Sequence, residues 1–318
     1  ERRLEWYFEQ WLVFPQLDET KAQDAKASVG EYGEALFAQV FKSHFDAYSE
    51  YRQIRGNLGN VRIEIEGNTP EFQALHWEAL KDPDLPRPLA VDCVMLRKSC
   101  QPTAMVANVA TSPTINLLVV VARPDEEKDV SYRTISRPLY EIVENSQLPV
   151  KIELLRPGTF EALSNHLEEK GAGYYHILHF DGHGALMTYE NVQQPSKPER
   201  YLYRGRYGRE DFQPFEGMKA FVCLEGELPG KVDLVEAAEF ANLLVGKGIP
   251  VCILNACQSG KIPNPPSPAS LAGNGQDARE TSLGSRLMAA GMQVVVAMGY
   301  SVTVSAATVM MQKLYEQL

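Results

Sequence analysis

The chain has 318 residues, which is enough for one large domain or two small ones with a substantial apolar core. Its formal net charge is −10, and this acidic balance argues against direct binding of nucleic acid or of an anionic membrane by this chain. No apolar run approaches the ~20 residues that span a bilayer. The five cysteines include no CxxC pair, which fits a reducing compartment, so we expect a cytoplasmic protein.

The first 112 residues mix helix and strand patterns. Large apolar residues at three- and four-residue steps predict one apolar helix face: Leu36, Phe37, Val40, Phe41 and Phe45. Residues 61–66 alternate apolar and polar side chains and predict a half-buried strand. Residues 69–72 predict a short helix with proline in its first turn, and residues 89–96 predict a second strand. The small and polar residues 98–113 read as a linker, so we expect an N-terminal α+β region before a second domain.

From residue 113 to residue 318, apolar strand patterns alternate with helix patterns. Strands are expected at 115–122, 150–155, 174–180, 220–224, 250–254 and 293–298, and helices at 136–146, 159–170, 234–244, 282–290 and 302–318. This alternation predicts an α/β domain with a mainly parallel sheet and helices on both faces. In such sheets, functional groups sit just past the carboxyl ends of the strands.

Two segments interrupt the alternation. Residues 185–218 are rich in tyrosine and arginine, and we interpret them as an insertion that could form a hairpin. Residues 259–280 are rich in proline and glycine and have almost no apolar content. We expect this second segment to be a mobile loop, poorly ordered until a substrate or an activator binds.

A reactive side chain follows each of two predicted strands. The strand at 174–180 runs into Asp181-Gly182-His183-Gly184, and the strand at 250–254 runs into Asn255-Ala256-Cys257. A thiol beside an imidazole can form a thiolate–imidazolium pair near neutral pH, as a cysteine nucleophile requires. The other cysteines within apolar runs are expected to be small buried hydrophobes: Cys93, Cys223 and Cys252.

The two motifs that carry these side chains resemble those of the CHAT proteases, in the caspase–separase–gingipain fold group. They are His-Phe-Asp-Gly-His-Gly at 179–184 and Asn-Ala-Cys-Gln-Ser-Gly at 255–260. Further similar segments are found at 4–8, 77–80, 122–124 and 290–298. The resemblance implies a caspase-like fold and a cysteine endopeptidase. In it, His183 rather than His179 is the general base and Cys257 is the nucleophile.

The resemblance also implies the surroundings of the dyad. Gly184 and the backbone amide of Cys257 would form the oxyanion site, and further residues would contact the substrate: Asp181, Asn255, Tyr300 and Ser301. No acidic residue occurs between Gly299 and Ser305, so we expect a substrate pocket that accepts a neutral or long apolar side chain, with Asp181, Asp125 and Asp129 as the alternative partners of a cation.

The family further implies a protein substrate, no cofactor, and activation by a partner or by an appended sensor domain in a bacterial regulatory or defence system. Because relatives commonly continue into repeat or sensor domains, we expect the chain to be part of a longer protein. The runner-up interpretation is a catalytically silent caspase-like interaction module.

A metal site and a phosphate site are weaker alternatives. His176, His179, His183 and Cys257 could ligate zinc, but His176 and His179 are three apart on a strand and point to opposite faces, so we expect no metal and interpret His179 as a core histidine. The remaining histidines are expected to be structural: His44, His76 and His166. Residues 226–232 lack the spacing and the Ser/Thr of a phosphate loop and predict a polar turn.

Overall fold

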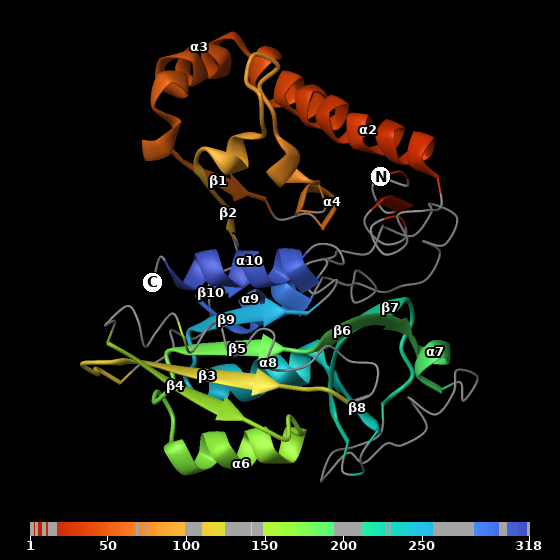
Figure 1. Ribbon diagram of the computed structural model, residues 1–318, viewed down its shortest axis with the longest axis vertical. Helices are drawn as coiled ribbons and strands as arrows, with labels where there is room; N and C mark the ends of the chain where they lie inside the picture. Colours follow the sequence, from red (N-terminus) through yellow and green to blue (C-terminus); the bar gives the residue numbers. More distant parts are fainter. Residues whose placement is uncertain are drawn as a thin grey trace. The chain divides into compact units, whose positions relative to one another are not determined.

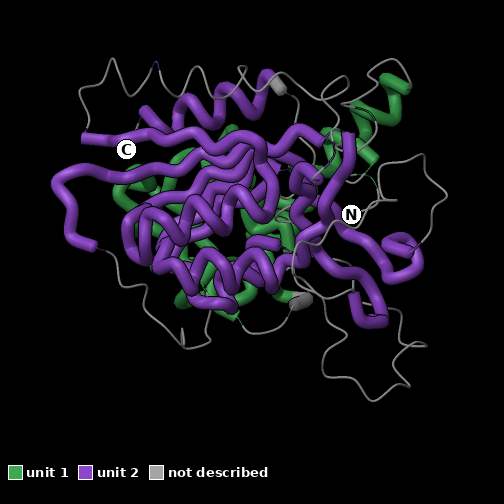
Figure 2. Tube along the Cα trace, turned by 90° about the horizontal axis from the view of Figure 1, so that it is seen from below, with its two compact units in different colours: residues 1–102 green, residues 103–318 purple. Residues whose placement is uncertain are grey.

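The computed structural model of the chain is drawn in Figure 1. It describes residues 3, 6, 7, 11, 18–67, 70–73, 75–98, 110–124, 141, 149–193, 212–226, 228, 230–256, 283–298 and 304–316. The chain divides into two compact units, Glu1–Pro102 and Thr103–Leu318, which Figure 2 shows in different colours. The division lies inside the segment that the sequence predicts as a linker.

The first unit combines helices with one pair of strands. Its strands β1 (Arg62–Glu66) and β2 (Val94–Lys98) are parallel, with Arg62 opposite Val94. The helical elements are α2 (Glu19–Phe37), the π-helix η2 (Ala38–Lys42), α3 (Phe45–Ile54), α4 (Pro70–Gln73) and the 3₁₀-helices η3 (Arg55–Asn60), η4 (Trp77–Ala79) and η5 (Leu89–Val91). The strand expected at 61–66 and the short helix expected at 69–72 are thereby confirmed.

The apolar helix face predicted at 36–45 is confirmed except at its last member. Leu36 and Phe37 are buried in the core of this unit, and Val40 and Phe41 pack against them. Phe45 is 86% exposed, so its assignment to the core is wrong. The chain turns between Lys42 and Phe45, where α3 begins, and the helical period therefore does not continue through this position.

The predicted strand at 89–96 is wrong in its first half. The backbone N–H groups of Asp92 and Cys93 both donate to the carbonyl of Leu89, each at 2.9 Å. These bonds close a turn, so β2 begins only at Val94. Leu89 is fully buried, and its apolar character reports a core position rather than a strand.

The centre of the second unit is a five-stranded parallel sheet in the order β10-β9-β5-β3-β4. Its strands are β3 (Ile115–Val121), β4 (Val150–Leu155), β5 (Ile177–Asp181), β9 (Val251–Asn255) and β10 (Val294–Val296). The flanking helices are α6 (Phe160–Lys170), α8 (Ala237–Gly246), α9 (Leu283–Ala290) and α10 (Val304–Tyr315). The prediction of an α/β fold with a mainly parallel sheet is confirmed.

Helices cover both faces of this sheet. Successive side chains of a strand point to opposite faces. Leu118 and Val120 of β3 pack in one core cluster with residues of α6, α8 and α9, whereas Leu117 and Val119 pack in another with residues of α10. In the view of Figure 1, α10 lies above the strands and α6 below them. Burial on both faces explains why β3 has a continuous apolar sequence.

A second, antiparallel sheet of the order β6-β7-β8 follows from β5. Its strands are β6 (His183–Thr188), β7 (Met218–Glu225) and β8 (Val232–Glu236), and α7 (Tyr189–Gln193) follows β6. The insertion expected at 185–218 therefore begins in β6, and the strand with which β6 pairs starts where the insertion ends. A turn between β7 and β8, with Gly226 N–H donating to the Lys231 carbonyl at 2.8 Å, occupies the stretch considered as a phosphate loop.

The helix predicted at 234–244 begins too early. Leu234 and Val235 belong to β8, where they lie opposite Cys223 and Val222 of β7, and α8 begins at Ala237. A short apolar run is compatible with a strand and with a buried helix alike, and only the pairing partner decides between them.

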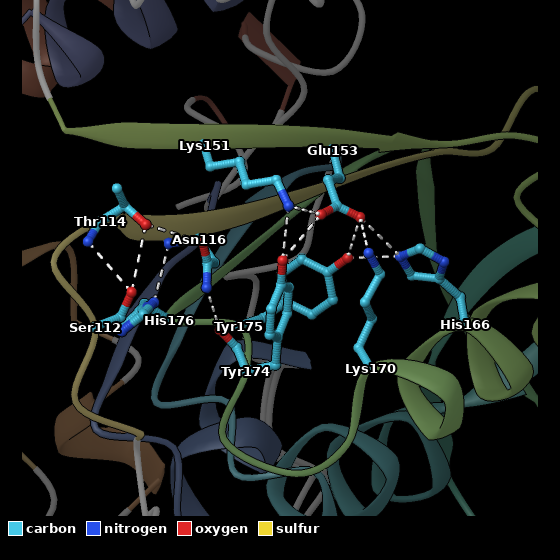
Figure 3. A network of polar contacts seen from close by, with 10 residues as sticks. All are labelled: Ser112, Thr114, Asn116, Lys151, Glu153, His166, Lys170, Tyr174, Tyr175 and His176. Carbon is cyan, nitrogen blue, oxygen red and sulfur yellow. Dashed lines mark hydrogen bonds and ion pairs between the residues drawn. The ribbon is translucent and has the colours of Figure 1, made fainter.

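A polar network joins the edge strand β4 to α6 (Figure 3). The Glu153 carboxylate lies 2.9 Å from Nζ of Lys151 and 2.8 Å from Nζ of Lys170, and it accepts a hydrogen bond of 2.9 Å from the Tyr175 hydroxyl. Partial burial acts to raise the pKa of Glu153, but the hydrogen bonds from these three side chains outweigh it and lower the pKa to about 2.

Two histidines belong to the same region, and one of them, His166, was predicted to be structural. His166 shares a hydrogen bond of 2.6 Å with the Tyr175 hydroxyl, and Nδ1 of His176 accepts one of 2.9 Å from the backbone N–H of Asn116. Figure 3 shows both contacts. The structural interpretation of His166 is thus confirmed.

The helix predicted at 136–146 and the loop predicted at 259–280 lie outside the described residues, apart from residue 141. Within the described part of the chain, no helix has both the length and the apolar character needed to cross a bilayer.

Candidate active site

The two strands that carry the reactive motifs are neighbours in the sheet. β5 and β9 pair in parallel, and their last residues, Asp181 and Asn255, lie opposite each other. Neighbouring strands are about 4.8 Å apart. His183 follows Asp181 by two residues and Cys257 follows Asn255 by two residues, so both motifs leave the same edge of the sheet from one paired position. Figure 1 shows β9 beside β5, with β6 leaving the carboxyl end of β5.

A buried ion pair lies at this edge. Arg123 follows β3, and its Nη2 lies 2.7 Å from Oδ2 of Asp181. Nη1 of Arg123 also donates to the backbone carbonyls of Ala122 and Asp181, at 3.1 and 3.0 Å. The side-chain amide of Asn255 donates to the other carboxylate oxygen of Asp181 at 2.7 Å. Arg123, Asp181 and Asn255 are only 7%, 1% and 7% exposed.

Backbone hydrogen bonds also join the segments at the ends of these strands. Gly182 N–H donates to the carbonyl of Asn255 at 3.3 Å, and Ala122 N–H donates to that of Asp181 at 3.0 Å. A Cβ on Gly182 would lie 2.6 Å from the ring of Phe180, which is itself fully buried. The turn into His183 therefore requires glycine for lack of space.

The structure places some of the predicted site residues and not others. His183 is the first residue of β6 and is exposed, and Gly184 is partly exposed beside it. Asp181 and Asn255 are buried in the network described above. Ala256, which precedes the predicted nucleophile, is also buried. Outside the described residues lie Cys257, Tyr300, Ser301, Asp125 and Asp129.

Arg123 is a site residue that the sequence analysis did not assign. The sequence feature that could have identified it is a charged residue just after a buried strand, in the segment at 122–124 that resembles the family. A charged residue is almost never fully buried without a partner. The partner, Asp181, is far away in the sequence, so only the strand order β3-β5 brings the two together.

The comparison with protein families agrees with this geometry. The family model of the CHAT domain matches residues 31–318, nearly the whole chain. The chain belongs to the CHAT domain family. Its fold is therefore caspase-like, of the type on which cysteine proteases are built. No curated protein sequence matches the chain significantly.

In this CHAT domain, the first histidine of the 179–184 motif is a core residue, as predicted. His179 is fully buried, and its Nδ1 shares a hydrogen bond of 2.7 Å with the Tyr315 hydroxyl of α10. Among the described residues, Nε2 of His179 has no hydrogen-bond partner. Burial lowers the pKa of His179 to about 4, although the Asp181 charge acts to raise it. A neutral, enclosed imidazole cannot reach a substrate, so it is poorly suited to act as the base.

This burial predicts an acid-sensitive contribution to stability. The pKa of His179 is lower in the folded chain than its ordinary value of 6.5, so the unfolded chain takes up the proton first as the pH falls. The contribution is complete above about pH 6.5 and is lost as the pH falls through 4, by about 3 kcal/mol in all. Urea denaturation between pH 7.5 and 4.5 should show this slope in the wild type and not in His179→Gln.

The exposed His44 supplies the control, because His44→Gln makes the same replacement at an exposed position. It should leave the pH slope unchanged. Identical slopes for the wild type and His179→Gln would contradict the assignment of His179 as a neutral core residue.

The remaining predictions concern metals and thiols. No cluster of three or more metal-ligating side chains occurs among the residues that the structure describes. Cys223 and Cys252 are buried, which confirms their interpretation as small core residues, and Cys93 is half-buried. Burial raises the pKa of the Cys252 thiol, so this side chain is unsuited to nucleophilic chemistry.

Proposed function

We propose that this CHAT domain is a cysteine endopeptidase in which His183 and Cys257 form the catalytic dyad. One observation carries the proposal. β5 and β9 are paired neighbours that end at Asp181 and Asn255, and each strand leads within two residues to one member of the dyad. The carboxyl edge of a parallel sheet is where α/β proteins assemble sites from separate segments.

The chemistry follows from the two side chains. His183 takes the proton of the Cys257 thiol, and the thiolate attacks the carbonyl carbon of the scissile peptide bond. The resulting oxyanion accepts hydrogen bonds from the backbone N–H groups of Gly184 and Cys257. His183 then gives its proton to the leaving amine, and a water molecule hydrolyses the thioester. No cofactor takes part in this sequence.

The proposal includes the wider setting that the family resemblance implies. The substrate is a protein, and a partner or an appended domain activates the enzyme, in a bacterial regulatory or defence system. The predicted loop at 259–280 directly follows the nucleophile in the sequence, and it is the segment through which such an activator would act.

Substrate preference is the first test of this function. Both carboxylate oxygens of Asp181 are occupied within the chain, by Arg123 and Asn255, and the side chain is almost fully buried. A substrate arginine could pair with Asp181 only by displacing one of them, which would leave either the Arg123 charge or the Asn255 amide buried without this partner. We therefore expect cleavage after neutral or long apolar residues.

Profiling the activated protein on a peptide library, with Cys257→Ala as the matched control, measures both activity and preference. Cleavage that is absent from the control supports the endopeptidase. A strict requirement for arginine would contradict the expected preference and would point to Asp125 or Asp129. Equal product from both proteins would favour the catalytically silent interaction module.

A further inference from the structure

Three polar side chains join the carboxyl ends of β3, β5 and β9, and we call this group of Arg123, Asp181 and Asn255 the strand-end clamp. All three are less than one-tenth exposed. Removing an ion pair from water is costly, and well-packed apolar side chains of the same volume are often at least as stable. The clamp is therefore not explained by stability alone, and its place beside the dyad motifs suggests a need for defined geometry.

The bonds of the clamp define that geometry. Oδ2 of Asp181 lies 2.7 Å from Nη2 of Arg123, and Oδ1 accepts from the Asn255 amide at 2.7 Å. The Arg123 guanidinium also holds two backbone carbonyls, those of Ala122 and Asp181. Rotation of the Asp181 side chain would break its bonds to both Arg123 and Asn255.

A further charged group at this edge is Glu225, the last residue of β7. Its Oε1 accepts a hydrogen bond of 2.9 Å from the backbone N–H of Arg123 and lies 4.0 Å from Nη2 of Arg156. Glu225 thus fixes the backbone from which the Arg123 side chain extends. The positive charges of Arg123 and Arg156 thus equal in number the negative charges of Asp181 and Glu225.

The clamp acts on the residues that lead to the dyad. Asp181 is two residues before His183, and Asn255 is two residues before Cys257. The side-chain bond between Asp181 and Asn255 and the backbone bond from Gly182 to Asn255 join these two segments to each other. The two segments are therefore bonded to each other just before they reach the dyad.

We propose that Arg123, Asp181 and Asn255 are positioning residues that hold His183 and Cys257 at a working separation, and that Asp181 and Asn255 do not contact the substrate. This inference rests on the proposed function. Its physical reason is that a nucleophile and its base must be held within about 0.5 Å of their productive arrangement. A displacement of 1 Å can cost about a hundredfold in rate.

The test uses substitutions that keep the shape of the clamp and change its hydrogen bonding. Asn255→Asp removes the amide donor and places a second carboxylate against Asp181. Asp181→Asn keeps an acceptor and removes the charge that pairs with Arg123. The double variant Asp181→Asn/Asn255→Asp exchanges the two groups and restores one amide donor facing one carboxylate.

Two quantities should be measured on each variant. The first is the rate at which iodoacetamide alkylates Cys257, read by mass spectrometry, which needs no substrate. The second is peptide cleavage, separated into kcat and KM. We expect Asn255→Asp to slow alkylation at least tenfold and to lower kcat about a hundredfold with little change in KM.

Asn116→Asp is the matched control. Asn116 is buried at the opposite end of β3, and its amide likewise donates a hydrogen bond, of 2.9 Å, to the carbonyl of Tyr174. This variant should lose stability as Asn255→Asp does. Its alkylation rate and kcat should stay within about twofold of the wild type, because it is remote from the dyad. The exchanged double variant should regain at least about tenfold over Asn255→Asp.

The outcomes separate the two proposals. Absence of Cys257-dependent cleavage in the wild type would reject the endopeptidase, while the alkylation rates would still test the clamp. Unchanged alkylation of Cys257 in a folded Asn255→Asp variant would overturn the clamp, as would an equal loss in Asn116→Asp. A change confined to KM would also overturn it, because the residues would then contact the substrate.

Discussion

Replacing Cys257 with alanine is expected to abolish peptide cleavage while the chain remains folded. The substitution removes the sulfur that would form the acyl-enzyme, and the two other cysteines that the structure describes in the second unit, Cys223 and Cys252, are buried. Loss of the nucleophile in comparable enzymes costs on the order of 10⁴-fold or more in kcat. The measurement is steady-state cleavage of the best library peptide, with circular dichroism to confirm folding.

His183→Ala should reduce cleavage by at least about a thousandfold, because the thiol then has no general base. His179→Gln is the control within the same motif. Its side chain is enclosed by the core, so we expect cleavage at pH 7.5 to remain within about tenfold of the wild type. A larger loss in His179→Gln than in His183→Ala would reverse the assignment of the base.

Alkylation of the thiols distinguishes a latent enzyme from a silent domain. A thiolate paired with an imidazolium reacts at pH 6.5, where ordinary thiols are protonated. Cys257 should therefore be modified first, and its advantage over the half-buried Cys93 should disappear in His183→Ala. Burial protects Cys252 and raises the pKa of its thiol, so this residue supplies an internal reference. Uniformly slow modification of Cys257 would reject the dyad.

Arg123→Met is expected to produce the largest loss of stability in the second unit. It removes the cation from a buried pair and leaves the Asn255 amide as the one side-chain partner of the Asp181 carboxylate in the described part of the chain. Breaking a buried pair from one side costs about 3–5 kcal/mol. Urea denaturation of the purified chain measures this loss as a lower midpoint with an unchanged m-value.

The double variant Arg123→Met/Asp181→Asn should recover more than half of that loss, because no unpaired charge remains buried. Lys219→Met is the comparison within the same unit. Lys219 pairs with Glu236 at 2.9 Å, but both side chains are 28% exposed, so the expected cost is at most about 1 kcal/mol. An equal effect of Arg123→Met and Lys219→Met would show that the pair at the strand ends is not desolvated in solution.

Periodicity predicted the second unit well where the elements are long or fully buried. The runs at 115–122 and 150–155 correspond to β3 and β4, and the helix predicted at 159–170 is α6, with Thr159 as its N-cap. Errors occurred where a short apolar run had two possible partners. Residues 234–236 belong to β8 because they pair with β7. A local sequence pattern cannot show this pairing, because the partner strand is a separate segment.

The site divides in the same way. The turn-forming glycine and the reactive side chains after two strands are local features, and they sufficed to predict His183 and Cys257 as a pair. The sequence alone did not reveal the buried partners of Asp181. As a carboxylate in the motif it suggested a substrate contact, but its burial beside Arg123 and Asn255 supports a positioning role instead.

The sequence by itself determined the family and the fold class, and it predicted the candidate dyad, because these depend on strand and helix periodicity and on short motifs that contiguous residues complete. Only the tertiary structure decided which charged groups face each other at the strand ends. Asp181 and Asn255 end β5 and β9, and Arg123 follows β3. These three segments are distant in the chain, and the order β9-β5-β3 makes them neighbours. A buried charge is tolerated only where a partner reaches it, and the arrangement of the strands, rather than any local pattern, supplies that partner.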